Sequence, residues 1–223
     1  MFVERLKSKE ALIETLRKVS VDHDGVISDT RKLVTDEFNL RFGTSHTPDE
    51  IRDWGTVITW GLEAGLSLKE ATSQDDELWY SQDILIKADP VPWAYEFMHE
   101  AYKLGVRIPI NSSRKPKLYQ STAEWYAKQL PFVIPEQIHV GLKDIPNGEL
   151  SKLWMIKIEG KSIHVEDSYS QARIILDNSD ISVILLANKK FFTAPYHEGR
   201  LTQIVGKNGQ MPTMRPVYKM FFG

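Results

Sequence analysis

The chain has no cysteine among its 223 residues, so disulfide bonds, thiolate metal ligands and cysteine nucleophiles are excluded. It has no apolar run close to the roughly 20 residues that a membrane-spanning helix needs. A strong excess of charge is also missing: the formal net charge is −2, which provides no field to attract nucleic acid or an anionic membrane. The pattern G-x-x-x-x-G-K-(S/T) is absent, which argues against a P-loop kinase.

What is present is typical of a globular protein, with 42% hydrophobic and 26% charged residues. This length suits either one sizeable core or a core domain with a small additional domain. The first seven residues are too charged for a secretory signal, so we expect a cytoplasmic location. We expect a small-molecule partner rather than a nucleic acid polymer or a membrane, and the sequence leaves open whether the chain forms a homodimer.

Short apolar segments alternate with helical patterns along most of the chain. Strands are expected at 19–22, 106–111, 138–141, 162–165 and 181–187. Helices are expected at 4–17, 93–104, 116–129, 151–158 and 170–177. Strands that are apolar on both faces predict an α/β fold, a Rossmann-like parallel sheet covered by helices on both faces. The tail from Lys189 onward is rich in Gly, Pro and aromatic residues and yields no clear prediction.

Residues 30–88 interrupt this alternation with helical patterns alone. Gly43 would end a first helix, and Thr47 with Glu50 forms a capping-box pattern at the start of another. Further helices are expected at 67–73 and 75–82. The helical content of this segment sets it apart from the rest of the chain.

Two prolines in the run Asp89-Pro90-Val91-Pro92 mark the point where the alternation resumes. We therefore expect a core domain made of residues 1–29 and 89–223, with a small helical cap of residues 30–88 inserted after the first strand. An insertion at that point lies over the carboxyl ends of the strands, where open α/β sheets bind ligands.

Acidic and polar side chains gather where the predicted strands end or the next helix begins. The clusters are Asp22-His23-Asp24-Gly25, Asn111-Ser112-Ser113-Arg114, Lys152, and Glu166-Asp167-Ser168. Taken alone, the first cluster is equally typical of a turn. Glu166 and Asp167 are harder to explain structurally, because adjacent acids repel unless a cation binds them. Together the clusters indicate a site that handles charge at one edge of the sheet.

The run Val19-Ser20-Val21-Asp22-His23-Asp24-Gly25-Val26 resembles the first motif of the haloacid dehalogenase (HAD) superfamily, and the other clusters follow in that superfamily's order. The resemblance implies that Asp22 attacks phosphorus and becomes an aspartyl-phosphate, while Asp24 serves as general acid and base. It implies that Ser112 hydrogen-bonds the phosphoryl group and that Lys152 neutralises charge. A carboxylate nucleophile splits a difficult phosphoryl transfer into two easier steps.

The same resemblance implies a Mg²⁺ site made by Asp22, the backbone carbonyl of Asp24, and Asp167, with Glu166 as a further ligand candidate. Oxygen ligands of this kind are the ones that Mg²⁺ prefers. Ser113 and Arg114 are candidates for substrate contact, although Arg114 is equally well explained as a solvated surface charge. The pKa of Asp24 would have to rise for this residue to donate a proton near neutral pH.

The segment 38–54 resembles the cap of the 5′(3′)-deoxyribonucleotidase group, which suggests a nucleoside 5′-monophosphate as substrate. Glu166-Asp167 and Thr30 depart from that group's pattern. The insertion is rich in aromatic residues, namely Phe38, Phe42, Trp54, Trp60, Trp79 and Tyr80. Such residues either stack on a base or form the core of the cap, and the second interpretation is favoured.

The sequence thus predicts a Mg²⁺-dependent phosphomonoesterase acting on a small phosphorylated metabolite. A phosphomutase and a non-catalytic phosphate-binding module remain alternatives. His23 lies between the two aspartates and is expected to face away from the metal in a structural role.

Overall fold

The structure is a computed structural model that describes residues 8–51, 55–141, 148–192, 196–197 and 199–223. Over these residues the strands form a six-stranded sheet in the order β3-β2-β1-β4-β5-β6, and every neighbouring pair is parallel. The strands are β1 (Val19–Val21), β2 (Ile110–Ser112), β3 (Ile138–Val140), β4 (Ile163–Glu166), β5 (Ser182–Ala187) and β6 (Leu201–Val205). The α/β fold expected from the sequence is confirmed.

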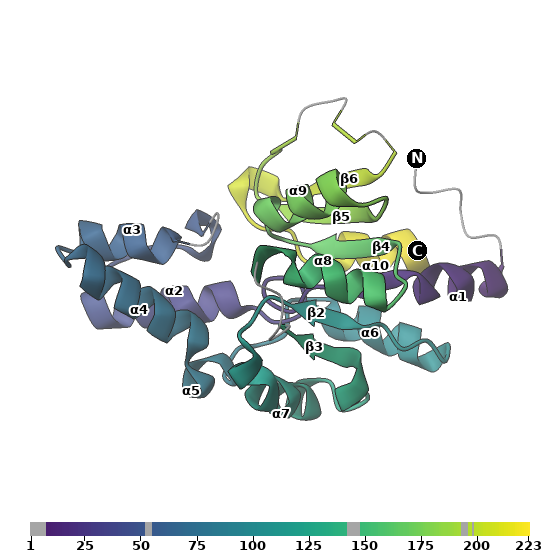
Figure 1. Ribbon diagram of the computed structural model, residues 1–223, viewed down its shortest axis with the longest axis horizontal. Helices are drawn as coiled ribbons and strands as arrows, with labels where there is room; N and C mark the ends of the chain where they lie inside the picture. The colour runs from purple at the N-terminus through teal and green to yellow at the C-terminus, as the bar shows by residue number, and fades with distance from the viewer. Residues whose placement is uncertain (1–7, 52–54, 142–147, 193–195, 198) are drawn as a thin grey trace.

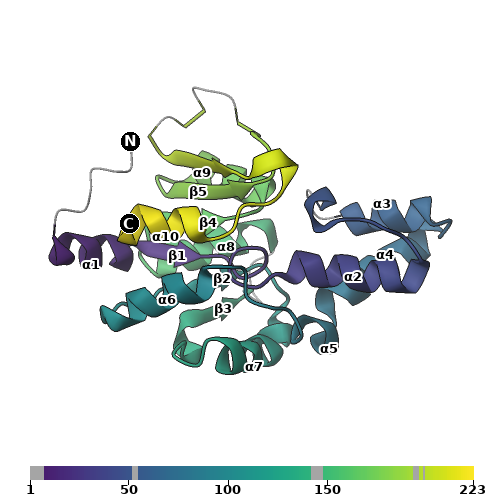
Figure 2. The ribbon, with the colours of Figure 1, turned by 180° about the vertical axis from the view of Figure 1, so that it is seen from behind.

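Helices cover both faces of the sheet (Figures 1 and 2). The helices on one face are α1 (Lys9–Arg17), α6 (Ala94–Lys103), α7 (Tyr119–Gln129) and α10 (Arg215–Phe222), and they share one apolar cluster with the strands. The other face carries α8 (Gly148–Ile158) and α9 (Tyr169–Asn178), which enclose a second cluster with β5. Short 3₁₀ turns lie at η2 (Pro116–Leu118), η3 (Pro135–Gln137) and η4 (Lys207–Gly209).

The sheet is polar where α8 covers its central strands. Side chains alternate along a strand, so burying Val19 and Val21 on the first face turns Ser20 and Asp22 to the second. His164 and Glu166 of β4 lie beside them in register, and all of these polar side chains are buried. Because buried polar groups require partners, this stripe of polar side chains beneath α8 marks a functional or tightly bonded region.

The insertion between β1 and α6 forms a separate group of helices at one end of the sheet (Figure 1). Its elements are α2 (Thr30–Phe42), η1 (Pro48–Glu50), α3 (Thr56–Glu63), α4 (Leu68–Tyr80) and α5 (Gln82–Leu85). These elements enclose an apolar cluster of their own around Phe38, Trp60 and Leu78. The two segments that connect the insertion to the rest of the chain lie side by side, because the Asp29 N–H donates to the Asp89 carbonyl over 2.7 Å.

Several predicted boundaries are wrong. The two helices expected at 67–73 and 75–82 are one helix, α4, because no Gly or Pro interrupts residues 68–80. The helix expected at 4–17 begins at Lys9 within the described residues, and residues 4–7 lie outside them. The strand expected at 106–111 shrinks to Ile110–Ser112. The helix expected to begin at Thr47 is only a 3₁₀ turn over Pro48–Glu50, and a separate helix, α3, begins at Thr56.

The C-terminal tail, for which the sequence yielded no prediction, supplies β6 and α10. Strand β6 pairs with β5 from Leu201 to Val205. Helix α10 buries Val217 and Phe221, which stand four residues apart on one helical face. The Phe221 ring lies 5.7 Å from that of Phe97 on α6, so the tail completes the first layer of helices.

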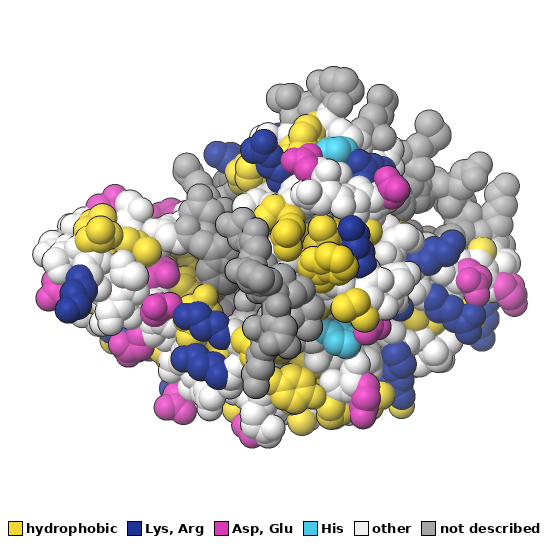
Figure 3. Space-filling view, in the orientation of Figure 1, with side chains coloured by type: hydrophobic (Ala, Val, Ile, Leu, Met, Phe, Trp, Pro, Cys, Tyr) yellow, Lys and Arg dark blue, Asp and Glu magenta, His cyan; other side chains and the backbone are white. Residues whose placement is uncertain are grey.

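On the face drawn in Figure 3, the described residues carry basic and acidic side chains that are interspersed. This mixture agrees with the small net charge of −2. Within the part of the chain that the structure describes, no helix is both long and apolar enough to cross a membrane.

Candidate active site

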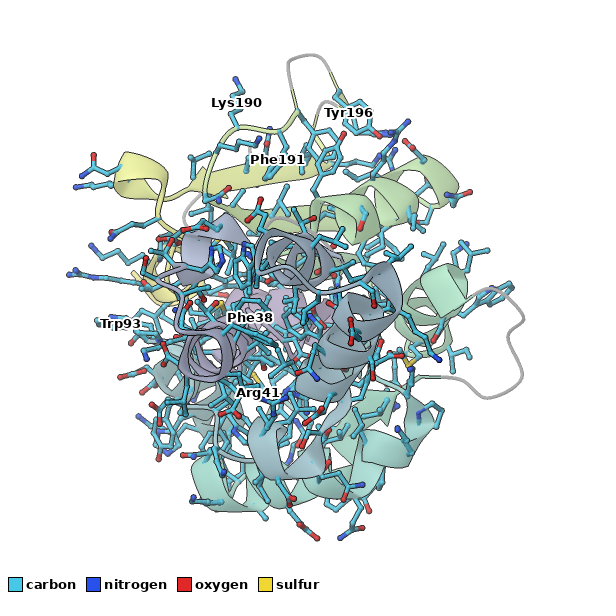
Figure 4. All side chains as sticks on the ribbon, turned by 90° about the vertical axis from the view of Figure 1, so that its left-hand side faces the viewer. Phe38, Arg41, Trp93, Lys190, Phe191 and Tyr196 are labelled. Carbon is cyan, nitrogen blue, oxygen red and sulfur yellow. The ribbon has the colours of Figure 1, made fainter. Side chains whose placement is uncertain are left out.

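A pocket of about 520 Å³, counting its solvent-open part, lies where the carboxyl ends of β1, β2 and β4 meet. Its lining from the sheet side is Asp22, Asp24, Ser113, Lys152, Asp167, Ser168 and Gln171. The insertion contributes Arg31, Ile51 and Trp79. In Figure 4 the insertion, which carries Phe38 and Arg41, stands in front of the sheet. Segments that lie far apart in the sequence therefore converge on one pocket.

Lys152 lies between two carboxylates on the polar side of the sheet. Its Nζ is 2.9 Å from Asp22 Oδ2 and 2.7 Å from Glu166 Oε2, and its side chain is 2% exposed. Burial disfavours the charged ammonium, but the carboxylates of Asp22 and Glu166 outweigh that effect and raise the pKa of Lys152 above its usual value. Lys152 is therefore a permanent positive charge beside Asp22. It lies inside α8, which begins at Gly148, rather than at the helix start expected from the sequence.

Glu166 is fully buried and both of its carboxylate oxygens have partners. Oε1 accepts hydrogen bonds from the backbone N–H groups of the next two residues, and Oε2 faces Lys152 and, at 3.3 Å, Nε2 of His164. Nδ1 of His164 lies 2.9 Å from Ser20 Oγ. Burial opposes ionisation of Glu166, but Lys152 prevails and lowers its pKa. This arrangement suits Glu166 to holding Lys152 in place.

Asp24 is bound by Arg114 through two parallel hydrogen bonds. Nη2 and Nε of Arg114 donate to Asp24 Oδ1 and Oδ2 over 2.7 and 3.0 Å, and Thr30 Oγ1 donates to Oδ1 over 2.6 Å. Burial disfavours the charged carboxylate, yet the guanidinium dominates and holds the pKa of Asp24 below its usual range. The increase in the pKa of Asp24 expected from the sequence is therefore not present in this arrangement.

Arg114 is buried, which decides against one of its two interpretations from the sequence. Its side chain is 3% exposed, donates through Nη1 to Thr122 Oγ1 over 3.0 Å, and is not part of the pocket lining described above. It is therefore not a solvated surface charge, while contact between Arg114 and substrate stays a prediction. Its guanidinium pairs with the Asp24 carboxylate through Nε and Nη2.

The two serines after β2 differ in their surroundings. Ser112 is buried, and its Oγ accepts a hydrogen bond from the Arg114 N–H over 3.1 Å. Ser113 lines the pocket, and its Oγ is buried without a hydrogen-bond partner among the described residues. In this structure Ser113 is therefore the better placed of the two to bind a ligand, while phosphoryl contact by Ser112 stays a prediction.

Asp22, Glu166 and Asp167 form a group suited to a divalent cation. One carboxylate oxygen from each lies within 4.8 Å of the others, and all three residues are buried. Burial raises the pKa of Asp22 well above its usual value, and that of Asp167 to about 7, with the Glu166 carboxylate adding to both effects. A divalent cation with oxygen preference would offset this repulsion, so the residues present fit Mg²⁺. Coordination by the Asp24 carbonyl stays a prediction.

His23 points to the opposite face of the sheet from the carboxylates. Nδ1 of His23 lies 2.8 Å from the Tyr126 hydroxyl, and the imidazole packs edge-on against Trp125 at 5.1 Å. The residue is fully buried. The expected structural role, with the side chain facing away from the cation site, agrees with this geometry.

The buried imidazole of His23 predicts an acid-sensitive contribution to stability. Burial and the nearby Arg114 lower the pKa of His23 to about 3, so only the unfolded state takes up a proton between that pH and the ordinary value. This contribution is complete above about pH 6.5 and declines as the pH falls. Between about pH 7.5 and about pH 5, wild type should lose about 2 kcal/mol more unfolding free energy than His23→Gln. Urea unfolding at both pH values measures the difference, and parallel losses would contradict it.

Most of the aromatic residues of the insertion serve its own packing. Phe38 and Trp60 belong to the insertion's buried cluster, with Phe42 and Tyr80 packed against it. Trp79 also contributes to that cluster, but it lines the pocket as well. Trp54 lies outside the described residues. The interpretation of these aromatics as mainly core residues is thus confirmed for those that the structure describes.

Sequence reasoning missed several residues of the site. Arg31 lies in the first turn of α2, and Gln171 lies in the first turn of α9. The available signal was their position: polar residues in the first helical turn after a functional strand end lie beside the same pocket. His164 had a different signal, a polar residue inside an otherwise apolar strand.

No protein-family model matches the chain, and a search of curated proteins finds no significant sequence relative. Solved structures do match. A HAD hydrolase of family IA, variant 3, from Entamoeba histolytica aligns with a TM-score of 0.55 and 15% identity, covering 92% of this chain and 99% of that one. A protein from Lactobacillus delbrueckii subsp. bulgaricus, provisionally named a phosphoglycolate phosphatase, aligns with a TM-score of 0.57 and 17% identity over 94% and 99%.

CbbY from Rhodobacter sphaeroides, solved in complex with phosphate, aligns with a TM-score of 0.53 and 15% identity over 85% of this chain and 93% of that one. At such identities the likeness defines the fold. The chain has a HAD-like fold, with a helical insertion after the first strand. These three structures do not confirm the resemblance of residues 38–54 to the 5′(3′)-deoxyribonucleotidase cap.

Proposed function

We propose that this protein is a Mg²⁺-dependent phosphomonoesterase that hydrolyses a small phosphorylated metabolite through an aspartyl-phosphate on Asp22. The observation that carries the proposal is the environment of Asp22. Its carboxylate lines the pocket, lies 2.9 Å from Lys152 and belongs to the group of three buried carboxylates that fits a divalent cation. A nucleophile, a fixed positive charge and metal-capable oxygens are the parts that phosphoryl transfer requires.

In the proposed reaction an Asp22 oxygen attacks phosphorus, the ester P–O bond breaks, and the leaving oxygen takes a proton to become an alcohol. Water then attacks the phosphorus of the aspartyl-phosphate, which releases inorganic phosphate and regenerates Asp22. Lys152 stabilises the charge that builds on the phosphoryl oxygens. A bound Mg²⁺, held by Asp22 and Asp167, supplies charge neutralisation between carboxylate and phosphate.

Asp24 is the proposed proton carrier because its side chain also lines the pocket. Paired with Arg114 it is a carboxylate, which suits it to accept the proton of the attacking water. Donation to the leaving oxygen requires a protonated Asp24 that has turned away from the guanidinium. Arg114 and Thr30 are the groups that Asp24 exchanges for substrate in that step.

We further propose that residues 30–88 act as a cap over this pocket and that residues 1–29 and 89–223 form the catalytic core. Arg31, Ile51 and Trp79 support this division, because these residues of the segment 30–88 line the pocket together with residues that follow the strands. We propose a small phosphate ester as the substrate, and a nucleoside monophosphate is one candidate because Trp79, which lines the pocket, could stack on a base.

A panel of phosphate esters tests the proposal directly. p-Nitrophenyl phosphate, sugar phosphates, phosphoglycolate and nucleoside monophosphates should include at least one that releases phosphate with Mg²⁺. Adding EDTA should lower the rate by at least roughly 100-fold, and excess Mg²⁺ should restore it. Hydrolysis that is unaffected by EDTA would contradict the role of the cation. Sugar phosphate isomers in place of phosphate would indicate a mutase, and binding without turnover would indicate a phosphate-binding module.

A further inference from the structure

Arg31 of α2 reaches from the insertion into the carboxylate cluster, in a position that the proposed catalytic roles do not use. We propose that Arg31 sets the charge balance of the pocket, strengthening the binding of phosphate at the expense of divalent-cation affinity. The inference rests on the proposed function for its ligands, but its geometry stands independently of turnover.

The guanidinium of Arg31 is fixed from both sides of the pocket. Nη2 lies 2.6 Å from Asp167 Oδ2 and donates to the Asp167 carbonyl over 3.3 Å, while Nη1 donates to the Ile51 carbonyl over 3.2 Å. The side chains of Arg31 and Asp167 are 12% and 5% exposed. This charge is therefore held in place beside the proposed cation site and only weakly screened by solvent.

Gly25 makes room for this contact. Its φ is +77°, and a Cβ at this position would stand 1.8 Å from Asp167 Oδ2 and 3.3 Å from Arg31 Nε. Any larger residue would push the carboxylate and guanidinium apart. The turn after Asp22 is thus shaped to admit the pair of Asp167 and Arg31 as well as to reverse the chain.

The charges of the pocket show what Arg31 contributes. The acidic side chains are Asp22, Asp24, Glu166 and Asp167, and the basic ones are Lys152, Arg114 and Arg31. With every group ionised, one net negative charge remains, and removal of Arg31 would leave two. A more negative pocket attracts a divalent cation more strongly and repels a phosphate dianion more strongly.

Two other roles for Arg31 predict a different change in cation affinity when Arg31 is removed. If Arg31 served only to orient Asp167 as a ligand, its loss would weaken cation binding. If it served only to contact substrate, its loss would leave cation binding unchanged. The direction of the change in cation affinity therefore separates the three interpretations.

The experiment is a calorimetric titration of metal-stripped protein with MgCl₂, comparing wild type with Arg31→Gln. We expect Arg31→Gln to bind Mg²⁺ roughly 10-fold more tightly and, at saturating Mg²⁺, to bind orthophosphate roughly 10-fold more weakly. Arg31→Lys keeps the charge and should bind Mg²⁺ within about 3-fold of wild type. An unchanged or weaker Mg²⁺ affinity in Arg31→Gln would overturn the inference.

Lys32→Gln provides a matched control, because Lys32 follows Arg31 on α2 and carries the same charge on the exposed surface, paired with Asp36. It should leave both affinities unchanged, since exposed charges are screened. Thermal unfolding with and without Mg²⁺ gives a second measurement if Arg31→Gln is less stable, because a ligand of the folded state raises Tm. There the Mg²⁺-induced rise in Tm should be larger for Arg31→Gln than for wild type.

Failure of this inference and failure of the proposed function are distinguishable. Hydrolysis by wild type together with weaker Mg²⁺ binding by Arg31→Gln would refute the inference and keep the phosphatase. If wild type hydrolyses no ester but Arg31→Gln binds Mg²⁺ more tightly, the phosphatase proposal is refuted. The inference that the charge of Arg31 weakens cation binding then still holds.

Discussion

Asp22→Asn is expected to lower the rate of Mg²⁺-dependent hydrolysis by at least about 1,000-fold, because an amide has no nucleophilic oxygen to form the phosphorylated intermediate. Asparagine has nearly the volume of aspartate, so the surrounding packing should persist. The measurement is steady-state phosphate release from the best substrate of the panel, normalised to folded protein.

The fold of Asp22→Asn should persist, because Lys152 keeps the buried Glu166 carboxylate as a partner at 2.7 Å. Asp83→Asn removes an exposed acid from the short helix α5 and serves as the matched control with full activity expected. Retention of wild-type turnover by Asp22→Asn would exclude the proposed nucleophile.

Lys152→Met is expected to have the largest effect on stability. Lys152 is the shared partner of Asp22 and Glu166, and all three side chains are buried. Removing one partner of a buried ion pair leaves uncompensated charge, which costs about 3–5 kcal/mol of unfolding free energy. The hydrolysis rate should also fall by roughly 100- to 1,000-fold, because one fixed charge at the phosphoryl oxygens is lost.

Urea unfolding and steady-state rates measure the two effects separately. The double variant Lys152→Met with Glu166→Gln removes one of the two orphaned carboxylates, so it should recover part of the stability without recovering activity. A single variant as stable as wild type would contradict the ion-pair geometry. Recovery of activity in the double variant would exclude Lys152 from the reaction.

The nucleophile and the acidic pair were accessible from the sequence because each follows an apolar strand. Val19-Ser20-Val21 precedes Asp22, and β4 ends at Glu166 beside Asp167. All strands of a parallel sheet end at the same edge. The expectation of a parallel sheet was therefore sufficient to place these residues at one edge.

The partners of these residues were not accessible in the same way. Arg114 binds Asp24 across 90 positions of sequence, and Arg31 binds Asp167 across 136. Periodicity and capping patterns describe neighbours within a few residues. They carry no information about which of several basic side chains will point at a given carboxylate.

The sequence by itself determined the alternation of strands and helices, the place of the helical insertion and the acids that end β1 and β4. These features follow from local apolar periodicity and chain punctuation, which act over less than about 20 residues. Only the tertiary structure decided the position of the tail, the sequestration of Arg114 and the contact of Arg31 with Asp167. Those outcomes depend on burial and on Coulombic contacts between distant segments, whose strength is defined only after the chain has folded.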